Sequence, residues 1–301
     1  MLNLKFARGN ARRNTIPVVT FTPLMIDCPM MSQTRMPALF LGHGTPMNTL
    51  DDNHSTQTWG RVGRDYPRPK AILCISAHWL TRGTGVTAMV RPPTIHDFGG
   101  FPQALFDFQY PAPGSPALAA RVRELLAPLP VALDQDWGLD HGTWSVLAHV
   151  YPEADIPIVQ LSMDGTRPPQ FHYDLGKLLM PLRDQGVLIF ASGNVIHNLG
   201  LMRRHAKHRA SSHDWARRFN DYARNALQTR DDQALINFAG QGADAKLSIP
   251  TTEHYLPLLY MLGACAGEAL VIENDGFEMD AISMLSVGTG AAPAQLQAAP
   301  A

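Results

Sequence analysis

The sequence predicts one α/β domain with a central, mostly parallel sheet flanked by helices. Short apolar runs alternate with longer amphipathic segments, which is the order typical of this fold class. Several of the short runs are apolar at every position, as expected for strands that helices cover on both faces. The expected strands are Ala38–Leu41, Ala71–Ser76, Gly85–Val90, Ile156–Leu161, Val187–Ala191, Ala269–Ile272 and Ser283–Val287.

The segments between these runs carry helix signals. Ser115 and Pro116 form a start signal, an N-capping hydroxyl followed by a first-turn proline, and apolar residues then recur at helical spacing. A second apolar stripe begins at Trp215 and ends at Ala226. Further helices are expected at Phe171–Leu182, at Trp144–Val150 and from about Tyr255.

Composition excludes several classes of protein. The chain has 301 residues, enough for one large α/β domain with a buried core. Its net charge of −1 provides no electrostatic footprint for nucleic acid or for an anionic membrane. Its apolar runs fall short of the roughly 18–20 residues of a membrane span. Its three cysteines are isolated from one another, so we expect no disulfide framework and no thiolate zinc site, which fits a reducing cytoplasm.

The domain is expected to occupy residues 35–290. We expect residues 1–34 to be a disordered extension and residues 291–301, rich in Ala, Pro and Gln, to be a disordered tail. The apolar stretch Ile16–Ile26 faintly imitates a signal peptide, but Pro17 and Pro23 interrupt it and no small-residue cleavage site follows. The cytoplasm is therefore the expected location. The sequence specifies no oligomeric state.

Three expected strands each end at or just before a histidine. His43, His78 and His197 follow the first, second and fifth of them. A single histidine in such a place is usually a hydrogen-bonded loop residue. Three are more informative, because ligands of open α/β sheets bind outside the carboxyl ends of the strands. Gly42 and Gly193 allow sharp backbone turns beside these imidazoles.

Two further histidines have informative neighbours. His141 lies in a polar, glycine-flanked turn between two tryptophans. His254 precedes a helix, because Pro257 is best tolerated in a first helical turn. The positive end of that helix dipole would favour the neutral imidazole, which is the form that binds metal. Either histidine alone would be a weak signal.

This set of side chains restricts the metal without selecting one. Several neutral imidazoles without a thiolate suit Zn, Fe, Cu or Ni and exclude a Ca or Mg cage. A zinc ion held by four histidines would have no coordination position free for a substrate unless one ligand is labile. Non-haem Fe(II) with open positions would suit O₂ chemistry.

Six motifs together resemble one known family. They appear in order between about residue 31 and residue 288, and they are Met36–Asn48, Ser76–Trp79, Thr94–Pro102, Asp140–Trp144, Ser192–Leu199 and Glu253–Leu258. These segments resemble the DOPA 4,5-dioxygenase family, a branch of the class III, LigB-like extradiol ring-cleavage dioxygenases. The resemblance implies a LigB-like fold.

The resemblance also implies roles for the histidines. It implies that His43, His78, His197 and His254 surround the metal, and that His141 lies beside it as an acid/base on the substrate side. Protocatechuate dioxygenases of the wider family use two histidines and a glutamate, with a further histidine as base. Here His254 takes the place of the carboxylate and His197 matches the base, so His197 could be a ligand, a catalytic acid/base, or both in turn.

The implied activity is extradiol opening of a catechol, such as L-DOPA, with O₂ at a mononuclear non-haem metal. Fe(II) is expected for catalysis, and Zn(II) would also fit the isolated protein. The small-molecule catechol and O₂ are the expected partners, with neither nucleic acid nor membrane. Two alternatives use the same histidines, a zinc-dependent hydrolase or lyase and a non-catalytic metal-binding module. The loop from His96 to Pro102 is expected to form a pocket wall or lid.

Overall fold

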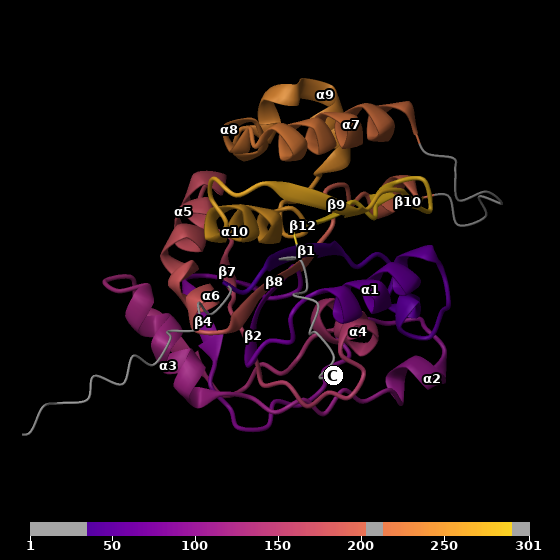
Figure 1. The fold of residues 1–301 in the computed structure, drawn as a ribbon. Helices are drawn as coiled ribbons and strands as arrows, with labels where there is room; N and C mark the ends of the chain where they lie inside the picture. The colour runs from indigo at the N-terminus through magenta and orange to yellow at the C-terminus, as the bar shows by residue number, and fades with distance from the viewer. Residues whose placement is uncertain (1–34, 203–212, 291–301) are drawn as a thin grey trace, which may run out of the picture. The chain divides into compact units, whose positions relative to one another are not determined.

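A six-stranded sheet forms the centre of the fold (Figure 1). The computed structural model describes residues 35–202 and 213–290, so the predicted extension at 1–34 and tail at 291–301 lie outside the described residues. The first three pairings in this sheet are parallel and the last two are antiparallel, so that β12 alone runs opposite to the other five strands, which confirms the mostly parallel prediction. In sheet order the strands are β6 (Ile158–Gln160), β2 (Ala71–Ser76), β8 (Val187–Gly193), β1 (Ala38–Gly42), β12 (Ser286–Thr289) and β9 (Leu270–Asn274).

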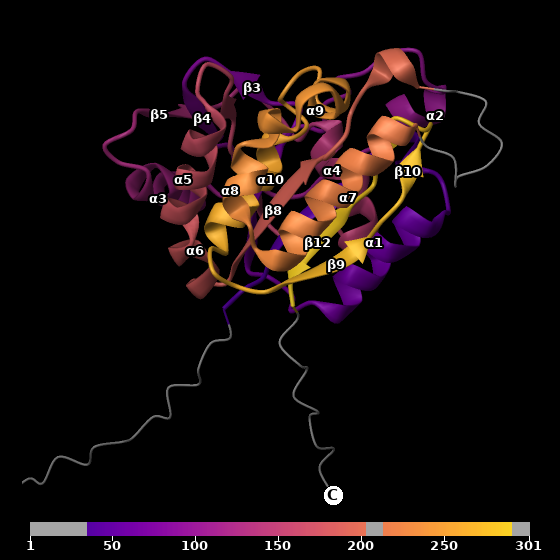
Figure 2. The same cartoon turned by 90° about the horizontal axis from the view of Figure 1, so that it is seen from above.

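Helices cover both faces of this sheet (Figure 1). Alternate residues of β1 point to opposite sides, as the period of a strand requires. Phe40 packs into one core with α5 and α10, whereas Leu39 and Leu41 pack into the other with α1 and α4. Figure 2 shows α7 lying along β9. These helices are α1 (His54–Asp65), α4 (His141–Val150), α5 (Pro169–Leu179), α7 (Asp214–Thr229) and α10 (Leu256–Ala264).

Shorter elements complete the described fold. Three two-stranded sheets pair β10 with β11, β3 with β7, and β4 with β5. The remaining elements are η1 (Pro46–Thr49), β3 (Leu80–Thr81), β4 (Thr84–Thr87), α2 (Gln103–Phe106), α3 (Pro116–Leu125), β5 (Val131–Asp134), β7 (Met163–Asp164), α6 (Pro181–Asp184), η2 (Leu199–Leu201), α8 (Asp232–Ile236), η3 (Phe238–Gln241), α9 (Gly242–Ser248), β10 (Phe277–Glu278) and β11 (Ile282–Ser283).

Local chemistry explains where the elements differ from the prediction. The helix expected at Phe171–Leu182 is split, because Pro181 cannot donate a helical hydrogen bond and instead starts α6. The predicted turn around His141 is the first turn of α4, because the Asp140 carboxylate caps the backbone amide of Thr143. The last predicted strand is divided between β11 and β12, with a register shift at Ser286.

The carboxyl ends of β1, β2 and β8 lie at one edge of the sheet. Gly42 is paired with Gly193, and Ser76 with Ser192. A Cβ atom on Gly193 would lie 2.2 Å from the carbonyl oxygen of His254, so only glycine lets the start of α10 approach β8 this closely. A backbone hydrogen bond of 2.8 Å from Asn194 to the same oxygen fixes the contact. Segments that are distant in sequence therefore meet at this edge.

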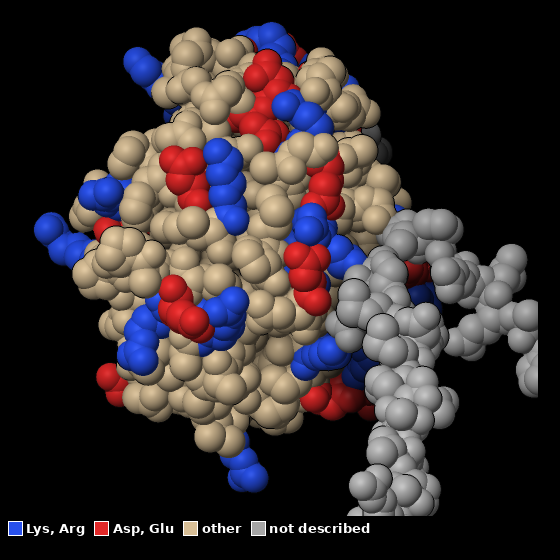
Figure 3. Space-filling view, turned by 60° about the vertical axis from the view of Figure 1, so that its left-hand side comes forward, with Lys and Arg blue, Asp and Glu red and all other residues tan. Residues whose placement is uncertain are grey.

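The described surface carries charges of both signs. On the face in Figure 3, Lys and Arg side chains alternate with Asp and Glu, in keeping with the net charge of −1. Among the described residues, no helix has the length and apolar character needed to cross a bilayer.

Close contact between α5 and α10 generates a prediction about stability. A Cβ on Gly176 would lie 2.2 Å from the carbonyl oxygen of Tyr260. Because this oxygen belongs to the backbone of α10, moving it away would cost free energy. We expect Gly176→Val to lower the free energy of unfolding by about 2–3 kcal/mol through overpacking, measured by urea denaturation. The same change at Gly240, which has open space around it, should alter stability by only about 0.5 kcal/mol. Equal effects at both sites would contradict the packing argument.

Candidate metal centre

Five histidines lie together at the carboxyl edge of the sheet. His43 and His78 follow β1 and β2, and His197 follows β8. His141 is the first residue of α4, and His254 directly precedes the N-cap of α10. The structure thus brings together all five histidines that the sequence singled out.

Three of the rings form a nearly equilateral triangle. The ring centroids of His43 and His78 are 5.1 Å apart, those of His78 and His254 are 5.1 Å apart, and those of His43 and His254 are 5.2 Å apart. Imidazoles that share one ion at about 2.1 Å from each nitrogen need ring centres about 5 Å apart. The spacing of this triangle matches that requirement.

The nitrogen atoms fall into two groups in which candidate ligand atoms lie within 4.8 Å of one another. One group holds His43, His78 and His141, and the other holds His197, Glu253 and His254. The four histidines expected around the metal therefore span both groups. By nitrogen distance His141 is the third member beside His43 and His78, whereas by ring spacing it is His254. His254 fits better than His141 as the third ring, because the rings of His78 and His141 are only 3.8 Å apart, closer than two ligands of one ion require.

Each ring of the triangle has an oxygen atom near its Nδ1. The Ser192 hydroxyl donates its hydrogen to the carbonyl of Gly142, so its oxygen accepts from Nδ1 of His43 at 3.1 Å. Nδ1 of His254 lies 3.2 Å from the Glu253 carboxylate. Oxygen acceptors at Nδ1 keep the proton there and leave Nε2 bare, which is the usual arrangement of metal-binding histidines.

Asp97 supplies the same kind of partner to His78 and His141. One carboxylate oxygen of Asp97 accepts from Nδ1 and from the backbone amide of His141, both at 2.9 Å. The other oxygen lies 3.3 Å from Nδ1 of His78. The motifs predicted no individual role for Asp97, although it lies in the predicted lid. Its signal in the sequence is a carboxylate next to His96 in a glycine-containing loop, which is weak.

The donor set fits a cation. Nε2 of His43 and Nε2 of His78 are 3.2 Å apart, while Nδ1 of His43 is hydrogen-bonded to Ser192 and Nδ1 of His78 lies 3.3 Å from a carboxylate oxygen of Asp97. Two bare nitrogen lone pairs at this separation repel each other unless a cation or a proton lies between them. Neutral imidazoles without a thiolate suit Zn or Fe and exclude Ca or Mg.

Burial keeps these histidines neutral. Only 1% of His43 and 6% of His254 is exposed. Desolvation, and next the neighbouring histidines, lower the pKa of both rings well below the usual value. Desolvation also lowers the pKa of His78 to about 3 and that of His197 to about 4. At neutral pH all four rings therefore offer lone pairs rather than positive charge.

His197 has a different relation to the cluster. Its ring stacks on that of His254, with centroids 3.5 Å apart and planes 8° from parallel. Its backbone amide donates to the carbonyl of Ser248. Metal ions bind close to the plane of an imidazole, and two nearly parallel planes 3.5 Å apart do not meet within metal-binding distance of the rings. In this arrangement the two stacked rings cannot both be in-plane ligands of one ion.

A buried polar network centred on Asp140 lies beneath the histidine cluster. The Asp140 carboxylate accepts from the Ser76 hydroxyl at 2.6 Å and from the Gln160 amide at 2.7 Å, besides capping α4. Desolvation, and next the charge of Asp97, raise the pKa of Asp140. This network connects the ends of β2 and β6 to the start of α4, so it fixes the positions from which His78 and His141 project.

Aromatic side chains line the site beside His141. Phe98 meets the His141 ring edge to face at 5.4 Å and contacts Phe101 at 5.3 Å. The Trp144 indole donates to the carbonyl of Ile95 and thereby ties α4 to this loop. The loop expected to be a lid thus lies beside the acid/base candidate.

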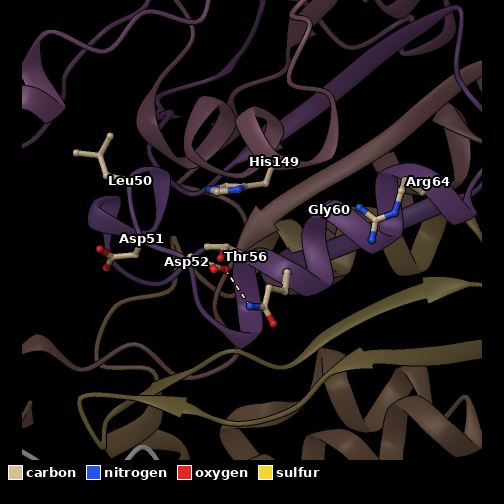
Figure 4. Close-up of a pocket in the computed structure, with 8 residues that line it drawn as sticks. Leu50, Asp51, Asp52, Thr56, Gly60, Arg64 and His149 are labelled. Carbon is tan, nitrogen blue, oxygen red and sulfur yellow. Dashed lines mark hydrogen bonds between the residues drawn. The ribbon is translucent and has the colours of Figure 1, made fainter.

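A separate surface pocket of about 450 Å³ lies away from the histidine cluster (Figure 4). His149 borders it, but its Nε2 donates to the carbonyl of Asn48 at 2.8 Å, which is a structural role. The Gln57 amide donates to Asp52 across its rim. Its residues are Leu50, Asp51, Asp52, Thr56, Gln57, Gly60, Arg64 and His149. None of the five clustered histidines lines this pocket.

The fold and the site define an α/β protein with a buried cluster of histidines whose spacing suits a metal ion. Residues 36–290 match the family described as the catalytic LigB subunit of aromatic ring-opening dioxygenase, and the chain belongs to this LigB family. It is an extradiol dioxygenase by this relationship, as the motifs predicted.

Named relatives and one solved structure support this assignment. A 4,5-DOPA dioxygenase extradiol of Escherichia coli (strain K12) is 55% identical over 274 residues, covering 89% of this chain and all of that protein. A protein of the same name from Beta vulgaris is 40% identical, covering 76% of this chain and 86% of its own length. The crystal structure of an uncharacterised protein from Escherichia coli K12 matches with a TM-score of 0.75 and 50% identity, covering 85% of this chain and all of that one.

The buried histidines generate a prediction about pH. An unfolded histidine takes up a proton near pH 6.5, whereas His78 and His197 stay neutral in the folded protein until about pH 3 and 4. Each therefore costs about 1.4 kcal/mol of stability per pH unit as the pH falls below 6.5. We expect the metal-free protein to lose stability steeply between pH 6.5 and pH 4, measured by urea denaturation. His197→Asn should reduce that slope and His54→Asn, at an exposed site, should not; a flat profile would contradict the burial argument.

Proposed function

We propose that this enzyme opens the ring of a catechol, with L-DOPA as the first candidate, next to its two hydroxyl groups. O₂ is the co-substrate, and His43, His78 and His254 hold a single Fe(II) ion. The observation that carries the proposal is the triangle of neutral rings, with centroids 5.1–5.2 Å apart and an oxygen near each Nδ1. A cytoplasmic location stays a prediction.

The proposed ligand set has three histidines rather than four. The stacking of His197 on His254 argues that only one of these two rings binds the ion in its plane. His254 is the better ligand, because it is more buried and its Nδ1 faces a carboxylate. His197 is then available as an acid/base. The motifs left open whether His197 is a ligand or an acid/base, and this proposal assigns it the acid/base role.

Three protein ligands suit ring-opening chemistry. Fe(II) held this way would supply vacant positions where a catechol and O₂ meet, which removes much of the entropic cost of bringing them together. The alternative metal, Zn(II), fits the same nitrogen atoms but would serve a hydrolase or lyase. The family relationship supports the dioxygenase over that alternative and over a non-catalytic metal module.

The neighbouring histidines would move protons. A neutral ring, His197 or His141, accepts the proton that a catechol hydroxyl loses on binding. In His141, Nδ1 donates to Asp97, so Nε2 is the atom that accepts. The protonated ring returns that proton to an oxygen atom during ring opening. Phe98 and Phe101 lie on the loop beside His141, where they would limit the access of water.

Metal binding by single variants tests the ligand set. We expect His43→Ala, His78→Ala and His254→Ala each to abolish binding of one equivalent of Zn(II) or Fe(II), because each removes one of three bonds. His197→Ala should keep the metal, as should the surface variant His54→Ala. Metal content after dialysis, measured by atomic emission, gives the readout. Loss of metal in His197→Ala to the same degree as in His254→Ala would support four ligands instead.

Oxygen uptake tests the reaction itself. The protein is stripped of metal, loaded anaerobically with Fe(II), and mixed with L-DOPA or a simple catechol in an oxygen-electrode cell. We expect one O₂ consumed per catechol, with a yellow product. His141→Asn should lower kcat by about 10²–10⁴-fold because an acid/base is lost, and it should still bind the metal. Activity that needs Zn(II) and proceeds without O₂ would reject the proposal in favour of a hydrolase.

A further inference from the structure

Asp97 lies in an irregular loop that is fixed by its neighbours. The backbone amide of Ile95 donates to the carbonyl of Leu139 at 2.8 Å, and the Trp144 indole donates to the carbonyl of Ile95. These bonds place the start of the loop against the segment that leads into α4. Asp97 follows two residues later and reaches toward the histidine cluster.

The carboxylate of Asp97 serves two histidines with its two oxygens. Oδ1 accepts from the backbone amide and from Nδ1 of His141, both at 2.9 Å, and Oδ2 lies 3.3 Å from Nδ1 of His78. The side chain of Asp97 is 18% exposed. Among the described residues, the hydrogen bonds and ion pairs of this carboxylate go to these two histidines alone.

An ionised carboxylate accepts hydrogen bonds and donates none. Each nitrogen that faces it is therefore favoured to carry a hydrogen, and the opposite nitrogen of each ring is left bare. In His78 that bare atom is Nε2, 3.2 Å from Nε2 of His43. In His141 it is the Nε2 assigned above to acid/base work. One side chain thus acts on both a proposed ligand and a proposed acid/base.

We propose that Asp97 is a positioning residue that sets the tautomer of His78 and of His141 together. It would hold both rings with hydrogen on Nδ1, so that one ring is ready to bind metal and the other to accept a proton. This inference rests on the proposed function for the roles of the two rings. The tautomers themselves do not depend on the reaction.

Asp140 provides a useful contrast. It is completely buried and bonded to Ser76, Gln160 and the first turn of α4, so it holds the backbone in place. Asp97 makes a single backbone contact, to His141. Removing the charge of Asp97 should therefore change the chemistry of the rings more than the stability of the fold.

The test is the tautomeric state of the histidines in the metal-free protein. Long-range ¹H–¹⁵N correlation spectra of protein labelled at histidine distinguish hydrogen on Nδ1 from hydrogen on Nε2. We expect hydrogen on Nδ1 in both His78 and His141 of the unaltered chain. Asp97→Asn replaces one oxygen by an NH₂ group, which donates. The ring facing that group should move its hydrogen to Nε2.

Two further variants control the experiment. Asp107→Asn changes an exposed carboxylate ten residues further along the chain that is bonded to Gln103, and it should leave both rings unaltered. Asp97→Glu keeps both acceptor oxygens and should retain hydrogen on Nδ1 of both rings. The proposal is overturned if Asp97→Asn leaves both tautomers as they were, or if Asp97→Glu shifts them as Asp97→Asn does.

Metal affinity gives a second readout, measured by competition with a chelator. We expect Asp97→Asn to weaken Zn(II) binding by about 10- to 100-fold, the usual effect of losing a carboxylate behind a ligand histidine, and Asp107→Asn to have no effect. Unchanged affinity in Asp97→Asn would overturn the link to His78. A shifted tautomer in a protein that opens no catechol ring would leave this inference intact and reject the proposed function instead.

Discussion

The site depends on keeping bare imidazole nitrogens close together in a buried place. His43 and His78 bring their Nε2 atoms to 3.2 Å, and burial lowers the pKa of both rings, so protonation does not relieve the repulsion at neutral pH. A bound cation would relieve it. The sheet supports this arrangement because β1, β2 and β8 end at one edge, and because glycine at 193 admits the start of α10 beside β8. The strand ends thus hold these histidines in an arrangement that suits a metal ion.

The carboxylates divide into two functions around this cluster. Asp140 is buried among hydrogen-bond donors and holds the backbone, whereas Asp97 and Glu253 face the Nδ1 atoms of histidines. Desolvation raises the pKa of Asp97, but the hydrogen bond and charge of His141, and then the charge of His78, outweigh it and lower the pKa to about 2. Asp97 is therefore ionised throughout the physiological range. Its negative charge faces the Nδ1 atoms of His141 and His78 and not the pair of Nε2 atoms between His43 and His78.

Much of this arrangement could be predicted from the chain alone, for identifiable reasons. Apolar strands that are followed by glycine and histidine predict both the sheet and its edge, so the amino-acid order indicates a common location for His43, His78 and His197, and the family motifs strengthen that prediction. The motifs added His141 and His254. The stacking of His197 on His254 could not be predicted, because it depends on ring orientation rather than on position in the chain. The role of Asp97 was missed for a similar reason, since a loop carboxylate acquires its partners only when distant segments fold together.

The contact between Gly193 and the carbonyl oxygen of His254 has a consequence for how such an enzyme can diversify. It joins β8 directly to the start of α10, while the chain between them forms α7, α8 and α9. Because main-chain atoms make this junction, substitutions among the exposed side chains of those three helices would leave the anchor of His254 in place. The outer surface of those helices can therefore change in sequence while His254 keeps its position.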